Sequence, residues 1–464
     1  MFKRGVAIIA AVVLCSVLAG LAGASEFDPA AATERYLSTI TGDAKAKSDA
    51  YFEGGYWFIL WNALASMAAA LLLLFTRASA GMRNLAESIT SWRGLQTFLY
   101  GVQFILVTSV LTFPLTYFEG FVREHEFGLS NMSQEEWLSE YAIGLAVNLV
   151  LTSIFIVGLY AVIRRTGEAW WLWATAVSVA FIMFGAAIAP VFISPLFNEY
   201  KPMREGALKE EILAMARANG VPADDVYEFN ASKQSKRISA NVSGFLGTTR
   251  ISLNDNLLER STPAEVRAVM AHEIGHYALG HIYEMIIVMA VVAAVSFLFI
   301  DIGFGTLNGL FGQWWGIRDF GDTAGLPVLV IMLSLFGLLS TPITNSIIRT
   351  NEAEADIFGL NAAREPDGFA TIALKLSEYR KLDPTPLEEI IFFDHPSGRS
   401  RISMAMRWKA ENLTDATSQV SEAPAPVEAS SLAAASSSEL NMEEPPAFQD
   451  SPAVPASLES AAAQ

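Results

Sequence analysis

Six apolar runs, each about 20 residues long, dominate the pattern of hydrophobic and polar positions along the chain. Their interiors carry almost no charge, which is unusual for helices in the core of a water-soluble protein. A helix of about 20 apolar residues crosses about 30 Å of hydrocarbon, so each run predicts a membrane span. The six runs lie near residues 56–76, 97–118, 141–163, 169–191, 283–301 and 326–347. The pattern therefore predicts a mainly α-helical, polytopic membrane helix bundle.

A further apolar run at the N-terminus has two interpretations. Lys3 and Arg4 precede an apolar stretch from Val6 to Leu21, and small residues follow it up to Ala24. This order is typical of a signal peptide formed by residues 1–24 and removed by cleavage, and it is equally compatible with a retained first membrane helix. The expected number of spans is therefore six or seven.

The polar stretches between these runs divide the chain into parts. We expect an N-terminal membrane-helix domain over residues 25–198, in which residues 25–55 form a polar connection. Residues 199–410 are water-soluble in composition, apart from the runs at 283–301 and 326–347, and form a second domain. Residues 411–464 hold nine acidic residues and no Lys or Arg, and are rich in Ala, Ser and Pro. This composition predicts a disordered acidic tail.

Within the second domain, the pattern predicts a small amount of strand beside helices. We expect a helix over residues 206–219 and two short strands over 239–246 and 249–254, joined as a hairpin. Further helices are expected over about 349–410. The segment Thr262-Pro263-Ala264-Glu265 predicts another helix start, since it combines a capping box with proline at the first helical position.

The helix that begins there carries the pattern His272-Glu273-Ile274-Gly275-His276. The two histidines lie one turn apart on the same side, a spacing at which two imidazoles can bind one zinc ion. Glu273 beside them can act as a general base on a water that the metal activates. The same five-residue pattern also arises by chance in amphipathic surface helices. The chain holds only five histidines, however, which favours the zinc site.

A catalytic zinc usually has three protein ligands, so a third is needed. His281 does not fit, because on a continuous helix it lies on the face opposite His272. Glu352 and Asp356 follow the last apolar run and share one face of a helix. Glu352 can complete the ligand set, and Asp356 can accept a hydrogen bond from Nδ1 of a ligating histidine. The alternative is an ordinary acidic helix start, which the helix dipole favours.

Together these motifs resemble the type I CAAX prenyl protease family, over about residues 56–408. The resemblance rests on the HExxH helix and on the segments Arg349-x-x-Glu352-x-x-x-Asp356, His395-Pro396, Arg401-Ile402, Ser194–Phe197, Glu205–Ile212, Ser232-Lys233 and Arg250–Leu258. Members of this family are polytopic zinc endopeptidases of membranes. The resemblance thus implies one zinc ion per chain and a gluzincin-like metallopeptidase domain with a small β-hairpin or sheet.

The resemblance also implies roles for individual residues. It implies zinc ligands at His272, His276 and Glu352, a general base at Glu273, a carboxylate behind the ligands at Asp356, an oxyanion-stabilising group at His395 and a supporting cation at Arg401. The chain departs from the family in the first strand, where Ser239-Ala240-Asn241 stands in place of Asn-Ala-Tyr. We expect Asn241 to contact the substrate instead of the missing asparagine.

The charge distribution bears on partners and location. The net charge is −17 and the chain has no basic patch, which argues against nucleic acid as a partner. The polar links 77–96 and 164–168 are rich in arginine, which predicts that they face the cytoplasm. The zinc site would then lie on the non-cytoplasmic side of a membrane, with a bacterial inner membrane as the expected location. Cys15 is the sole cysteine, so no disulfide forms within the chain.

The predicted function is zinc-dependent cleavage of peptide bonds in membrane-associated or misfolded proteins by an enzyme embedded in the lipid bilayer. The alternative is a membrane chaperone or assembly factor that keeps this fold without turning over a substrate. The retained Glu273 argues against the alternative, since binding zinc does not need a base.

Overall fold

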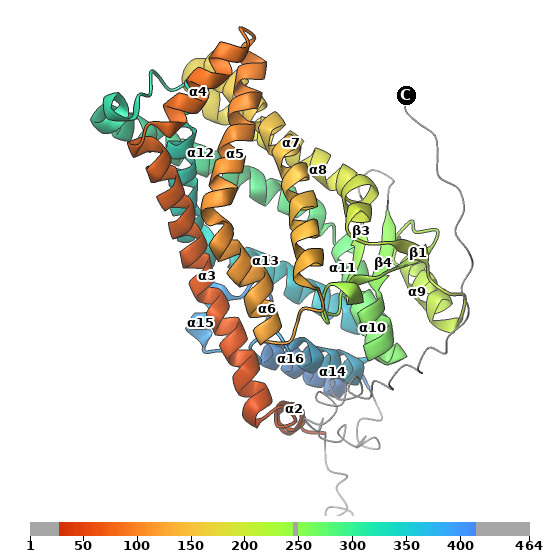
Figure 1. Cartoon of the computed structure of the whole chain (residues 1–464). Coiled ribbons are helices and arrows are strands. Elements are labelled where there is room, and N and C mark those ends of the chain that lie inside the picture. The colour runs from red at the N-terminus through yellow and green to blue at the C-terminus, as the bar shows by residue number, and fades with distance from the viewer. Residues whose placement is uncertain (1–26, 245–248, 414–464) are drawn as a thin grey trace, which may run out of the picture. The chain divides into compact units, whose positions relative to one another are not determined.

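The computed structural model describes residues 27–244 and 249–413. The predicted signal peptide therefore lies outside the described residues, and so does the predicted acidic tail except for residues 411–413. Six long helices occupy the six apolar runs, as Figure 1 shows. They are α3 (Gly42–Phe75), α5 (Arg93–Tyr117), α7 (Gln134–Thr166), α8 (Trp170–Ile188), α12 (His281–Trp315) and α13 (Leu326–Ala363). The prediction of a mainly α-helical membrane bundle is confirmed.

The predicted count of six or seven spans is slightly wrong. Among the described residues, five continuous helical segments are long and apolar enough to cross a membrane. The third of these, Gln134–Leu196, takes in both α7 and α8. The two helices are separated at Gly167, whose φ of 53° is accessible to glycine at little cost. In each of the five segments at most 28% of the most apolar window is buried inside the protein, which leaves large apolar faces for lipid.

The membrane helices extend well beyond their apolar runs. The polar connection expected at residues 25–55 is instead largely helical, with α2 (Pro29–Leu37) followed directly by the polar first turns of α3. Pairs such as Lys45–Asp49, with Nζ and Oδ2 2.5 Å apart, explain why a polar segment continues the helix. Similarly, α13 continues from the membrane into the polar part of the protein. Helices that cross the membrane thus lead straight into the functional site.

A small mixed sheet stands at one side of the polar part. It consists of β1 (Tyr200–Pro202), β2 (Val226–Phe229), β3 (Ala240–Ser243) and β4 (Arg250–Asn254), in the order β1-β2-β4-β3. The pairs β1–β2 and β3–β4 are antiparallel, and β2–β4 is parallel. The structure confirms strands at both predicted positions, whereas β1 and β2 were not predicted. Within this sheet β3 is an edge strand.

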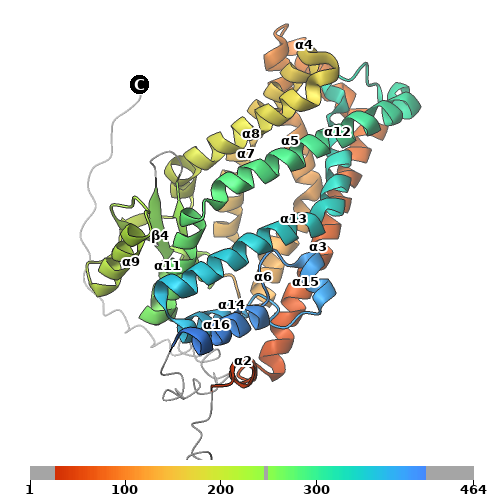
Figure 2. The same ribbon diagram turned by 180° about the vertical axis from the view of Figure 1, so that it is seen from behind.

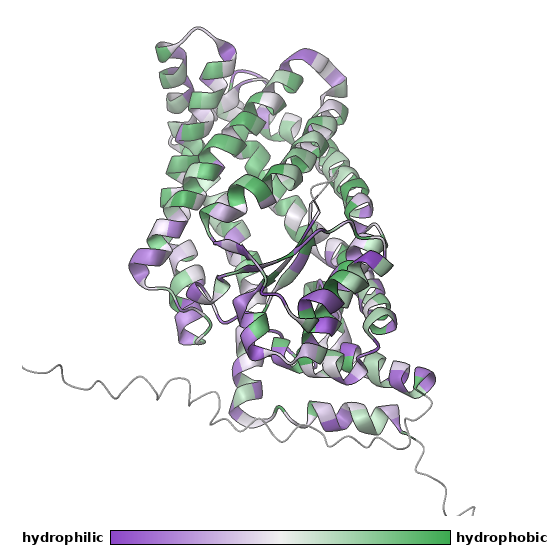
Figure 3. Ribbon diagram, turned by 90° about the vertical axis from the view of Figure 1, so that its right-hand side faces the viewer, coloured by the Kyte–Doolittle hydropathy of each residue, from purple (hydrophilic) through white to green (hydrophobic). Residues whose placement is uncertain are grey.

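Shorter helices complete the described part. They are α4 (Ala78–Ile89), α6 (Arg123–Glu126), α9 (Ala207–Ala218), α10 (Asp255–Arg260), α11 (Pro263–Ala278), α14 (Pro366–Leu376), α15 (Pro386–Phe392) and α16 (Gly398–Asn412). The helix α11 lies between two apolar cores. Val266, Met270 and Ile274 belong to the core under the sheet, and Ala268 belongs to the core formed with α14, α16 and α2. Figure 2 shows α11 beside α13 from behind, and Figure 3 shows the apolar bundle adjoining this more polar part.

Candidate metal centre

The helix α11 begins as the sequence predicts. The hydroxyl of Thr262 accepts a hydrogen bond from the amide of Glu265, whose carboxylate accepts one from the amide of Thr262 in return. Apolar residues on two opposite sides of α11 are buried in two different cores, and this fixes the rotation of the helix about its own axis. His272 and His276 then lie one turn apart, with their Nε2 atoms separated by 3.1 Å.

The helix α13 brings Glu352 to these two histidines. Its Oε2 lies 3.3 Å from Nε2 of His272, and its Oε1 lies 3.5 Å from Nε2 of His276. Metal–ligand bonds of about 2.0–2.2 Å in a tetrahedral zinc site separate the ligand atoms by roughly 3.3–3.6 Å. The buried Oε2 of Glu352 has only long contacts, of 3.2–3.6 Å, with nitrogen atoms of His272, His395 and Arg401. An acceptor of this kind fits a cation, and among those residues His272, His276 and Glu352 form the one group that could hold a metal.

Two glycines allow the helices to approach this closely. A Cβ on Gly359 of α13 would lie 3.0 Å from the backbone nitrogen of His272. A Cβ on Gly275 of α11 would lie 3.0 Å from the ring of Phe358. The contact between α11 and α13 therefore depends on the absence of side chains at these positions, and this contact sets the distance from Glu352 to the histidines.

A buried carboxylate orients the first histidine. Oδ1 of Asp356 lies 2.8 Å from Nδ1 of His272. Asp356 is fully buried and accepts two hydrogen bonds of 2.8 Å from Arg401 of α16. The structure thus brings Asp356 and Arg401 behind the ligands. Burial by itself lowers the pKa of His272, but the carboxylates of Asp356 and Glu352 outweigh this effect and raise it to about 9.

The second histidine is oriented by a residue that the sequence argument set aside. Nδ1 of His276 lies 2.8 Å from Nδ1 of His281, and Nε2 of His281 lies 3.5 Å from Oε2 of Glu354. The argument from a continuous helix failed because α11 ends at Ala278 and the chain turns at Gly280, with φ of 74°. His281 lies outside the His-His-Glu group that could hold a metal, but it contacts the ring of His276, a member of that group. In the sequence, Gly280 was the one available indication that the helix ends before His281.

Glu273 lies in a cavity next to the histidines. The cavity has a volume of about 390 Å³, and its lining includes His272, Glu273, His395 and the segment Arg237–Ala240. Burial raises the pKa of Glu273 to about 7, which suits a group that accepts and returns a proton near neutral pH. Burial, together with the charge of His272, lowers the pKa of His276 to about 4, so its ring is neutral and can serve as a ligand at pH 7.

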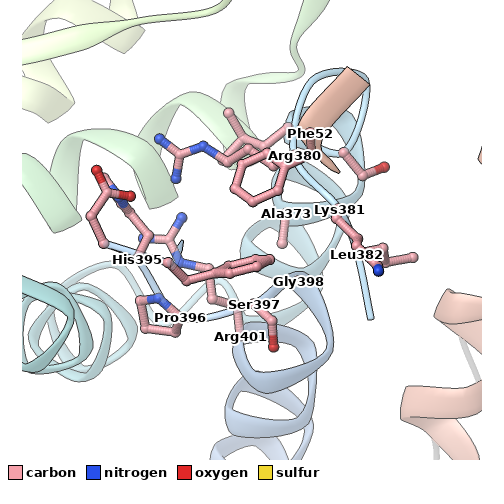
Figure 4. A pocket seen from close by; sticks show the side chains of 14 residues that line it. Phe52, Ala373, Arg380, Lys381, Leu382, His395, Pro396, Ser397, Gly398 and Arg401 are labelled. Carbon is pink, nitrogen blue, oxygen red and sulfur yellow. The ribbon is translucent and has the colours of Figure 1, made fainter. Parts of the chain in front are cut away.

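His395 and Asn241 are placed differently with respect to this cavity. Nε2 of His395 lies 3.2 Å from Oε2 of Glu352, and its Nδ1 lies 2.8 Å from Asp394. Figure 4 shows His395 beside Arg401. Asn241 is paired with Ser252 across β3 and β4, and the cavity is lined by the residues just before it, Ile238, Ser239 and Ala240.

A membrane helix bundle that holds a His-His-Glu group beside a partly buried glutamate defines a polytopic membrane metalloprotease. Comparisons with known proteins agree. Residues 202–409 match the model of "Peptidase family M48", and residues 30–199 match that of "CAAX prenyl protease N-terminal, five membrane helices". The chain is similar to peptidase family M48 over its second half and is a membrane-embedded zinc metalloendopeptidase.

Individual relatives cover most of the described chain. The uncharacterized metalloprotease YhfN of Bacillus subtilis is 28% identical over 346 residues, which are 74% of this chain and 80% of YhfN. CAAX prenyl protease 1 of Saccharomyces cerevisiae is 27% identical over 322 residues, 64% of this chain and 69% of that protein. The crystal structure of S. mikatae Ste24p has the same fold, with a TM-score of 0.64 at 22% identity over 79% of this chain and 89% of that one.

Proposed function

We propose that this protein cleaves peptide bonds in membrane-associated or misfolded proteins, with its zinc held by His272, His276 and Glu352. The observation that carries the proposal is the convergence of three ligand atoms, all within 4.8 Å of one another, next to a cavity whose lining includes His272 and Glu273. Zinc bound there supplies a Lewis acid that polarises the scissile carbonyl and makes water more acidic. The remaining steps fall to side chains of the protein.

Glu273 is the proposed general base. It takes a proton from the attacking water and delivers it to the leaving nitrogen, and a pKa of about 7 suits both transfers. His395 is the proposed oxyanion-stabilising group, because its ring adjoins Glu352 and lines the same cavity. Asp356 and Arg401 are proposed to position His272 and do not touch the substrate.

The substrate is proposed to lie extended along the edge strand β3. An edge strand offers unpaired backbone groups, and an extended peptide can pair with them. Ile238, Ser239 and Ala240 lead into this strand and line the cavity, which supports an approach along this route. Asn241, within β3 itself, is proposed to contact the substrate just beyond the cavity.

The proximity of the site to the membrane supports membrane-associated substrates. The helix α12 begins at His281, next to the ring of His276, and α13 carries Glu352 on the same helix as an apolar span. We further propose a functional division into a membrane-helix domain up to residue 198 and a metallopeptidase domain over 199–410. The border lies close to that between the two family matches.

The proposed location is a bacterial inner membrane with the active site on the non-cytoplasmic side. Arg83 pairs with Asp322, and Nε of Arg164 donates a 2.9 Å hydrogen bond to the carbonyl of Gly321. The arginine-rich links thus gather at one end of the bundle, near α4, while α14 and α16 lie at the other (Figure 1). Arginine at the first end supports a cytoplasmic position there.

The variant Glu273→Gln tests the proposed reaction. We expect zinc content equal to that of wild type and loss of peptide cleavage by at least a thousandfold in proteoliposomes, since the base is removed while the ligands stay. Glu284→Gln, at an exposed glutamate in the first turn of α12, is the matched control and should retain activity. Full cleavage by zinc-loaded Glu273→Gln would refute the role, and trapping bound proteins on this variant identifies the substrates.

A further inference from the structure

Three arginines line the cavity beside the proposed zinc ligands, and the guanidinium groups of two of them bind other side chains of the protein. Arg401 donates both of its 2.8 Å hydrogen bonds to Asp356. Arg237 lies 2.8 Å from a carboxylate oxygen of Glu124 and also donates a hydrogen bond to the hydroxyl of Tyr51. These two guanidinium groups hold parts of the protein together. The third arginine, Arg380, is different.

The guanidinium of Arg380 makes no hydrogen bond or ion pair with any of the residues that the structure describes. Its backbone is fixed, since its carbonyl accepts a 3.3 Å hydrogen bond from the hydroxyl of Ser48 in α3. Its side chain lines the 390 Å³ cavity together with Glu273 and His395. Figure 4 shows it extending from its loop toward His395. Burial, followed by the charge of Arg401, lowers its pKa, although the charges of Asp394 and Glu352 act in the opposite direction.

The nearby carboxylates are already committed to other partners. Asp356 accepts hydrogen bonds from Arg401, and Asp394 accepts the hydrogen bond of His395. Glu352 belongs to the proposed ligand set. A guanidinium presents five donors in a planar fork that matches a carboxylate in a two-point contact. A half-buried guanidinium without a partner has a cost that a ligand carboxylate would remove.

We infer that Arg380 determines substrate specificity by binding a carboxylate of the peptide close to the scissile bond. The inference rests on the proposed function and adds a substrate feature to it. The carboxylate has two possible sources with the same chemistry, namely the side chain of Asp or Glu and the free C-terminus of the chain. The cavity volume falls in the range of ligand pockets, so part of a peptide fits beside Arg380.

The test uses fluorogenic peptides that differ in carboxylate content. The parent peptide is neutral and amidated; in one series a single Glu replaces each position in turn, and one further peptide has a free C-terminus. We expect wild-type protein to cleave one carboxylate peptide with kcat/KM about tenfold to hundredfold above that of the parent, the range of hydrogen bonds to charged groups. Preference for the Glu series or for the free C-terminus identifies the source. A wild-type protein without any such preference overturns the inference.

Variants assign the preference to the residue. Arg380→Gln should abolish the preference, so that kcat/KM for the selected carboxylate peptide falls to about that of the neutral parent with the same variant. Arg217→Gln, at an exposed arginine in the last turn of α9, is the matched control and should keep the preference. Arg380→Glu should instead favour peptides with Lys at the selected position. An Arg380→Gln effect that is equal for all peptides means a structural role and overturns the inference.

Binding separates this inference from the proposed function. The zinc-loaded Glu273→Gln protein binds the same peptides without turnover, and fluorescence anisotropy gives their affinities. Carboxylate-dependent binding that Arg380→Gln removes supports Arg380 even if no wild-type cleavage is found, and in that case the proposed function fails alone. If the wild-type protein cleaves the peptides but their binding does not depend on a carboxylate, the proposed function stands and the role of Arg380 is refuted.

Discussion

Replacement of Gly359 by alanine should move Glu352 away from the two histidines. The new Cβ would lie 3.0 Å from the backbone nitrogen and 3.2 Å from the Cα of His272, whereas ordinary contacts begin at 3.4 Å. Because the atoms it meets belong to the backbone, α11 and α13 must separate by a few tenths of an ångström. Overpacking of this kind costs about 1–3 kcal/mol, against a gain of about 1 kcal/mol in helix propensity. The net loss in unfolding free energy is about 0–2 kcal/mol.

The larger effect of this substitution falls on the metal. The ligand atoms lie 3.1–3.5 Å apart, and zinc sites tolerate distance changes of about 0.2 Å. We therefore expect Gly359→Ala to weaken zinc binding at least tenfold, measured by competition with a chromophoric chelator in detergent. Gly337→Ala in the same helix, where an added Cβ meets nothing within 4 Å, should leave the affinity unchanged. Equal zinc affinities for the two variants would refute the argument that this helix contact sets the ligand geometry.

Three further predictions concern His272 and the residues behind the proposed ligands. Asp356→Asn removes both hydrogen bonds of the buried Arg401 to a carboxylate and leaves it only the 3.6 Å contact with Glu352. The unfolding free energy should fall by about 3–5 kcal/mol, and the double variant Asp356→Asn/Arg401→Gln should recover most of this loss in thermal scans; an unrecovered loss speaks against the buried pair. His281→Ala should weaken zinc binding about tenfold to hundredfold, and unchanged chelator competition would exclude its orienting role. His272 without metal has a pKa of about 9, so below pH 9 zinc must displace a proton from it. The apparent zinc affinity should therefore rise about tenfold per pH unit from pH 7 to 9 and then level off. A flat profile contradicts this.

The sequence predicted those features whose physical cause is local or periodic. Apolar runs of membrane length marked the six long helices, and the capping box at Thr262 marked the start of α11. The fixed i to i+4 geometry of a helix paired His272 with His276 and Glu352 with Asp356. The structure then brought these two pairs together, as the chemistry of zinc required.

The features that the sequence did not predict depend on tertiary contacts or on single turns. The contact of His281 with His276 was not predicted, because Gly280, with a positive φ, ends the helix on which the argument relied. The strands β1 and β2 hold only three and four residues, too few for a periodic pattern to appear. The free guanidinium of Arg380 became visible only after every neighbouring carboxylate had been assigned to another partner.

Anomalous diffraction at the zinc absorption edge, from crystals of the purified full-length protein, tests the central claim most directly. We predict one zinc ion per chain, at about 2.0–2.2 Å from Nε2 of His272, Nε2 of His276 and a carboxylate oxygen of Glu352. A zinc ion held by other side chains, or a Glu352 carboxylate turned away from a metal that the histidines bind, would contradict this account.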